Sequence, residues 1–237
     1  MYSNSEQLII FDADGTIIDA FNAIDQTFAH HGMALGDLDR FQKRHNLFKY
    51  LGGLKEFPFN LKMQLGKQNR KKLLATLTEV YCEEARLFPG VAELLRTLIA
   101  APGVRIGIVT RNITIEPILT LSKLLARHDI DISALDFMVH VPLGHEKTST
   151  FRSVRKQFGI NPARSFACGD EHKDFFFAMA AGMHPFMVSY GFDDHKRLTH
   201  KFQVPEDVIS RTPAELCQRV LHALDISQQL CHDNVIR

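Results

Sequence analysis

Short apolar runs that end at polar clusters are the feature that most constrains the fold of this chain. None of them alternates between apolar and polar residues, as a strand with one exposed face would. Each has the length of a strand that is buried on both faces, which is typical of a parallel sheet. We therefore predict strands over residues 8–11, 104–109, 137–141, 165–168 and 185–189.

Helical patterns lie between most of these runs. Within residues 91–98, apolar side chains recur at helical spacing, and Pro89 stands where a proline of the first helical turn fits. Strand and helix therefore alternate, which predicts an α/β fold with a doubly wound, mainly parallel, Rossmann-like sheet and right-handed crossovers. Further helices are expected over residues 115–126, 149–158, 175–181 and 214–224.

The stretch from residue 20 to residue 86 breaks this alternation. It holds helical patterns such as residues 21–31 and 70–85 but no run of strand type, and it is too long for a simple loop. We therefore predict a Rossmann-like core of residues 1–19 and 87–237, with an inserted helical cap domain of residues 20–86.

Composition and charge narrow the class of protein. An apolar fraction of 45% and a net charge of +1 indicate a globular chain that has no general attraction to nucleic acid or to an anionic membrane. No stretch approaches the roughly 20 apolar residues of a membrane span. The four cysteines form no CxxC pair, and the first residues lack a signal-peptide pattern, so we expect a cytoplasmic protein. The oligomeric state is left open.

Polar residues that can carry chemistry follow the predicted strands. In an open α/β sheet, ligands bind beyond the carboxyl ends of the strands, where such side chains would meet in one pocket. Carboxylates follow the first and fourth strands, a hydroxyl and an arginine end the second, and a lysine follows the third. These residues are Asp12, Asp14, Thr110, Arg111, Lys147, Asp170, Glu171 and Asp174.

The order of these motifs resembles that of the haloacid dehalogenase superfamily, in its phosphatase branch. The matching segments are Asp-x-Asp-Gly-Thr at 12–16, Thr110 after an apolar run, Lys147, and Gly-Asp with a later aspartate at 169–174. The predicted cap has the position found in the helical-cap subgroup, which includes the phosphoglycolate phosphatases. The resemblance implies a phosphatase that hydrolyses a small phosphorylated metabolite through an aspartyl-phosphate, with Mg²⁺ as cofactor.

The resemblance also assigns roles to the two aspartates of the first motif. Asp12 would be the nucleophile, and Asp14 would protonate the leaving alkoxide and then accept a proton from the attacking water. Mg²⁺ would be held by the carboxylates of Asp12 and Asp170 and by the backbone carbonyl of Asp14.

The later motifs would bind the phosphoryl group and support the site. Thr110 would donate a hydrogen bond to a phosphoryl oxygen, and Lys147 would balance the charge of the transition state. Asp174 would orient Lys147 or a metal-bound water.

The sequence departs from the family pattern at two of these positions. Arg111 follows the threonine of the second motif, where a small polar residue is common, and it either contacts substrate or lies on the surface. Glu171 follows Asp170, where serine is frequent, and it either joins the outer shell of the metal or caps a helix. Basic residues of the cap are further candidates for substrate contact, among them Arg44, Lys49 and Lys55.

Two other functions stay open. A phosphomutase of the same family would use the same nucleophile, although Thr16 after Gly15 favours hydrolysis. A non-catalytic binding protein on the same fold is the other alternative, and the intact motif set argues against it.

Overall fold

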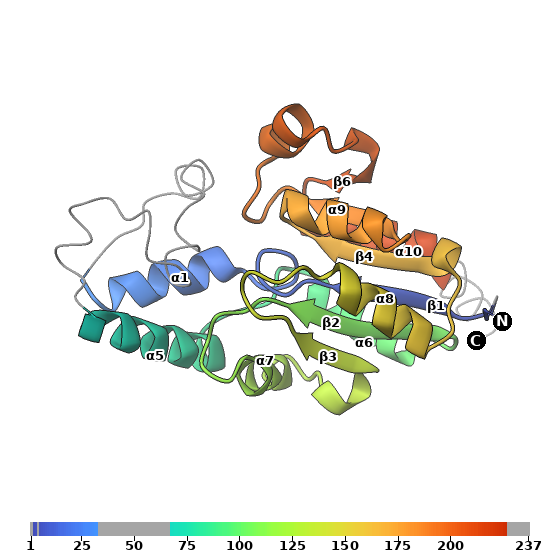
Figure 1. Cartoon of the computed structure of the whole chain (residues 1–237). Helices are drawn as coiled ribbons and strands as arrows, with labels where there is room; N and C mark the ends of the chain where they lie inside the picture. Colours follow the sequence, from blue (N-terminus) through green and yellow to red (C-terminus); the bar gives the residue numbers. More distant parts are fainter. Residues whose placement is uncertain (1, 4, 33–66, 227–237) are drawn as a thin grey trace.

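A computed structural model of the protein describes residues 2, 3, 5–32 and 67–226 (Figure 1). About half of the predicted cap therefore lies outside the described residues, as do Arg44, Lys49 and Lys55. The predicted helices 21–31 and 70–85 do fall on described residues.

One six-stranded sheet forms the centre of the molecule, in the order β3-β2-β1-β4-β5-β6. All neighbouring strands run parallel, which confirms the predicted doubly wound α/β fold. β6 was not predicted, because it has two residues, too few to give a hydrophobic pattern, and it exists through pairing with the end of β5. The strands are β1 (Gln7–Phe11), β2 (Val104–Thr110), β3 (Phe137–His140), β4 (Ser165–Gly169), β5 (His184–Val188) and β6 (Ile209–Ser210).

Helices cover both faces of the sheet, so the strands are apolar on both sides. In β1, Ile9 and Phe11 belong to the same apolar cluster as α6, α7 and α10, whereas Leu8 and Ile10 belong to the cluster of α8 and α9. None of the described helices is both long and apolar enough to cross a membrane. The five helices are α6 (Val91–Ala100), α7 (Pro117–Ala126), α8 (Thr148–Gln157), α9 (His172–Ala180) and α10 (Pro213–Ala223).

The helices α7 and α9 begin at other residues than expected, for local reasons. α7 begins at Pro117 rather than at residue 115, because Glu116 has a left-handed backbone with φ 51° that ends the preceding loop. α9 begins at His172 rather than at residue 175. There the Asp174 carboxylate accepts the backbone N–H of Glu171, the N-cap residue, at 3.3 Å.

α1 (Ala20–Ala29) and α5 (Lys67–Glu83) lie side by side beyond the carboxyl ends of the strands (Figure 1). Their apolar faces join the cluster that covers one face of the sheet. The chain leaves and re-enters the core at two adjacent segments, where Ile18 and Leu87 form an antiparallel bridge. The N–H of Asp19 donates to the carbonyl of Arg86 at 2.9 Å. The division of the chain into core and cap stays a prediction.

Candidate active site

A fully buried lysine joins two of the aspartates at the carboxyl end of the sheet. Lys147 precedes α8 and is 0% exposed. Its Nζ lies 2.6 Å from Oδ2 of Asp12, which follows β1, and 2.9 Å from Oδ1 of Asp174, in the first turn of α9. Three elements that are distant in sequence therefore meet at one ammonium group.

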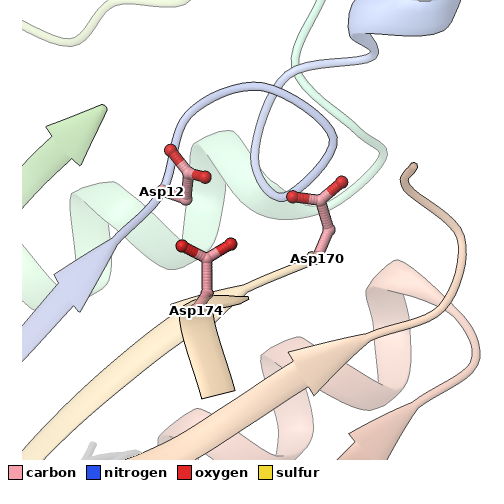
Figure 2. A group of neighbouring side chains, drawn as sticks. All are labelled: Asp12, Asp170 and Asp174. Carbon is pink, nitrogen blue, oxygen red and sulfur yellow. The ribbon is translucent and has the colours of Figure 1, made fainter. Parts of the chain in front are cut away.

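Asp170 joins Asp12 and Asp174 in a group that we call the acidic cluster. Carboxylate oxygens of the three residues lie within 4.8 Å of one another, at the ends of β1 and β4 and the start of α9 (Figure 2). Lys147 supplies one positive charge against three carboxylates, so ionised side chains would leave a buried excess of negative charge. Oxygen ligands of this number and charge suit a hard divalent cation. The acidic cluster could therefore hold a metal ion.

Burial disfavours the ionised forms of Asp12 and Asp170. It raises the pKa of Asp12 to about 7, although the ion pair with Lys147 acts in the opposite direction. Burial also raises the pKa of Asp170 well above its ordinary value, and the neighbouring charge of Asp12 adds to this rise. A cation at the cluster would favour the ionised forms, because an opposite charge nearby lowers the pKa of a carboxyl group.

Two glycines let the chain close around Asp170. A Cβ at Gly15 or at Gly191 would collide with the Asp170 carboxylate, and Gly15 has a left-handed backbone with φ 77°. The N–H of Phe192 donates to Oδ2 of Asp170 at 2.7 Å. Side chains at either glycine would displace the Asp170 carboxylate from the acidic cluster.

Asp14 has different surroundings, which we call the Asp14 pocket. The hydroxyl of Tyr81, on α5, donates to Oδ1 of Asp14 at 2.7 Å. Nδ2 of Asn112, just after β2, lies 3.1 Å from Oδ1 and 3.0 Å from Oδ2. Burial raises the pKa of Asp14, and the hydrogen bonds from Tyr81 and Asn112 act against that rise. Asp14 is thus held by neutral donors.

Neither donor was predicted as a site residue. Asn112 could have been identified from the sequence, since it belongs to the polar segment that follows a predicted strand. No sequence pattern pointed to Tyr81, because an aromatic residue at an apolar position of a helix is usually part of the hydrophobic core. Its place beside Asp14 results from the packing of α5 against the rest of the molecule.

The remaining predicted residues lie at the end of β2 and the start of α9. Thr110 is fully buried, and its Oγ1 accepts the N–H of Asn112 at 3.1 Å. Arg111 forms an ion pair of 2.6 Å with Glu171 and lies over the ring of Phe177. Both departures from the family pattern therefore contact each other, and Glu171 is also the N-cap residue of α9.

The two carboxylates that the sequence predicted as metal ligands, those of Asp12 and Asp170, lie together in the structure. The carboxylates that come together are those of Asp12, Asp170 and Asp174, whereas the Asp14 carboxylate contacts Tyr81 and Asn112. The assignment of the Asp14 backbone carbonyl as a ligand stays a prediction.

Comparisons with known proteins point to one family. A family model described as haloacid dehalogenase-like hydrolase matches residues 9–188. Phosphoglycolate phosphatase 1 of Pseudomonas aeruginosa is 25% identical over 202 residues, which cover 79% of this chain and 71% of that protein.

Solved structures agree in fold. A haloacid dehalogenase-like family hydrolase from Streptococcus pneumoniae matches with a TM-score of 0.59 at 20% identity, over 92% of this chain and 100% of that one. CbbY from Rhodobacter sphaeroides, in complex with phosphate, matches with a TM-score of 0.55 at 20% identity, over 80% and 89% of the two chains.

Proposed function

We propose that this chain, which belongs to the haloacid dehalogenase-like hydrolase family, is of the phosphatase branch and hydrolyses a phosphate monoester of a small metabolite through an aspartyl-phosphate on Asp12. The observation that carries this proposal is the contact of Asp12 with Lys147 inside the acidic cluster. A buried carboxylate beside one ammonium group and two further acids is arranged for charged chemistry rather than for packing.

Asp12 is oriented for attack by contacts to both of its oxygens. Oδ1 accepts the N–H of Ala13 at 2.8 Å, and Oδ2 pairs with Lys147. A carboxylate oxygen forms a bond to phosphorus while the bond from phosphorus to the alcohol oxygen breaks. Lys147 and the hydroxyl of Thr110 would offset the charge on the phosphoryl oxygens.

The acidic cluster fits Mg²⁺ as the cofactor. Asp12 and Asp170 would hold the ion with carboxylate oxygens, and Asp174 is close enough to contribute directly or through a water. Bound Mg²⁺ would supply positive charge that offsets the repulsion between the Asp12 carboxylate and the substrate phosphate.

Asp14 would act as the general acid and then as the general base. It lies two positions after Asp12 in the chain, and hydrogen bonds hold it beside the nucleophile without a direct ion pair to Lys147 among the described contacts. It would give a proton to the leaving oxygen and later take one from the water that attacks the aspartyl-phosphate. Arg111, held by Glu171, is the proposed contact for a negatively charged part of the substrate.

The substrate is proposed to be a small phosphorylated metabolite, and 2-phosphoglycolate is the first to test, given the name of the curated relative. The proposal includes neither nucleic acid nor a membrane as a partner, leaves the oligomeric state open, and includes a cytoplasmic location, in line with the net charge and the cysteine pattern.

The test is phosphate release from p-nitrophenyl phosphate, 2-phosphoglycolate and a panel of sugar phosphates, with Mg²⁺ and with excess chelator. We expect release with Mg²⁺ and none with chelator. A phosphomutase would instead give isomerised sugar phosphate with little free phosphate. An absence of Mg²⁺-dependent turnover with every compound would contradict the proposed function.

A further inference from the structure

We propose that Tyr81 is a positioning residue that orients the Asp14 carboxylate for proton transfer, so that α5 completes the acid–base part of the site. This inference rests on the proposed function, because it assigns a partner to the proposed acid–base residue. It concerns a residue that no motif of the sequence includes.

The contact is short and buried at both ends. The Tyr81 hydroxyl lies 2.7 Å from Oδ1 of Asp14, and the two residues are 1% and 8% exposed. A hydrogen bond to an ionised carboxylate is stronger than one between neutral groups, and water does not compete with it in a buried place. Asp14 is therefore held firmly in the orientation that the structure shows.

Tyr81 also makes the two oxygens of Asp14 unequal. Asn112 donates to both oxygens from one nitrogen atom, at nearly equal distances, and so does not distinguish them. The additional bond from Tyr81 falls on Oδ1 alone. Oδ2 is left with more free acceptor capacity, which makes it the oxygen that carries the transferred proton.

A second contact fixes the position of α5 relative to this pocket. Thr78 lies one helical turn before Tyr81, and its Oγ1 accepts the N–H of Ile115 at 3.0 Å. Ile115 is in the segment that follows β2 and Asn112. Asn112 is thus positioned by the core and Tyr81 by α5, and the contact of Thr78 with Ile115 links the two segments.

The substitution Tyr81→Phe removes the hydroxyl and keeps the ring. We would measure kcat/KM with saturating Mg²⁺ for phenyl phosphate and for p-nitrophenyl phosphate, which have similar shapes. Phenolate is a poorer leaving group than nitrophenolate and depends more on a proton, whereas nitrophenolate leaves readily without one. We expect a loss of about 10-fold to 100-fold on the phenyl ester, the effect of one hydrogen bond to a charged group, and a clearly smaller loss on the nitrophenyl ester.

Tyr190→Phe is the matched control. Tyr190 is a partly buried tyrosine near the site, but its hydroxyl donates to the carbonyl of Thr16 at 3.0 Å and not to Asp14. We expect this variant to keep the wild-type ratio of the two esters. A structural disturbance by loss of a tyrosine hydroxyl that donates a hydrogen bond would change both variants alike, and that outcome would overturn the inference.

A double-mutant cycle tests whether Tyr81 acts through Asp14. In an Asp14→Asn background, Tyr81→Phe should cause little further loss on the phenyl ester, because the acid is already absent. Equal further losses in both backgrounds would overturn the inference. Wild-type protein that hydrolyses neither ester would instead contradict the proposed function, so the two failures are distinguishable.

Discussion

The acidic cluster and the Asp14 pocket are built around two aspartates that stand two positions apart in the chain. Both are buried to about the same extent, since 9% of Asp12 and 8% of Asp14 is exposed. In the acidic cluster, the contacts are ionic: Asp12 pairs with Lys147 and shares the space with two other acids. In the Asp14 pocket, the contacts are hydrogen bonds from the neutral groups of Tyr81 and Asn112.

This difference fits the two kinds of chemistry that we propose for the two aspartates. A carboxylate that attacks phosphorus and binds a cation must remain charged, and Lys147 favours that state. A carboxyl group that gives and takes a proton must exist in both forms, which neutral donors permit. Environments that differ in this way assign different roles to like residues.

The largest expected effect comes from replacing Asp12, the proposed nucleophile in the acidic cluster, with a neutral residue. Asp12→Asn keeps the shape of the side chain but removes the attacking charge, so kcat should fall by roughly 10⁴-fold or more on every ester. Intact-mass analysis should detect a phosphoryl adduct on the wild-type protein and none on the variant. Near wild-type turnover by the folded variant would mean that Asp12 is not the nucleophile.

The corresponding change in the Asp14 pocket should depend on the leaving group. Asp14→Asn removes general acid–base assistance, which is worth about 10²–10⁴-fold, so that loss should appear with phenyl phosphate and be smaller with p-nitrophenyl phosphate. Single-turnover kinetics on both esters would measure it. Equal losses on the two esters would assign Asp14 to the metal site or to structure, and would remove the contrast between the two regions.

Lys147, which pairs with two residues of the acidic cluster, should matter for stability as well as for activity. Lys147→Met leaves three buried acids without their cation, and the free energy of unfolding in excess chelator should fall by about 3–5 kcal/mol. Lys123→Met, at an exposed position of α7, is the control and should change it by less than about 0.5 kcal/mol. Denaturant titrations of both variants would check this, and similar small effects would show that the cluster is not charged in the metal-free protein.

The smallest effect expected is stabilisation by the metal itself. At a Mg²⁺ concentration about 100 times its Kd, binding to the folded protein should add about 2.7 kcal/mol to the free energy of unfolding and raise Tm. Asp170→Asn should reduce this gain, whereas Asp14→Asn should largely keep it. If both variants lost the gain equally, the metal site would extend into the Asp14 pocket.

Most of the fold could be predicted from local patterns. The apolar runs predicted five strands to within one or two residues at each end. They could do so because a short, continuously apolar run is typical of a strand that is buried on both faces. β6 and the starts of α7 and α9 were missed. β6 depends on pairing with β5, the start of α7 on the left-handed backbone at Glu116, and the start of α9 on the contact of the Asp174 carboxylate with the N–H of Glu171. None of these appears in the periodicity.

The sequence by itself determined which residue types stand at the ends of the strands, and hence that Asp12, Lys147 and Asp170 would meet. Parallel strands have a common carboxyl edge, so topology alone collects these residues. Only the tertiary structure decided their partners. Tyr81 reaches Asp14 across 67 positions of the chain, and Arg111 reaches Glu171 across 60. Such contacts depend on how helices pack and in which direction side chains point, and local periodicity contains no information on either.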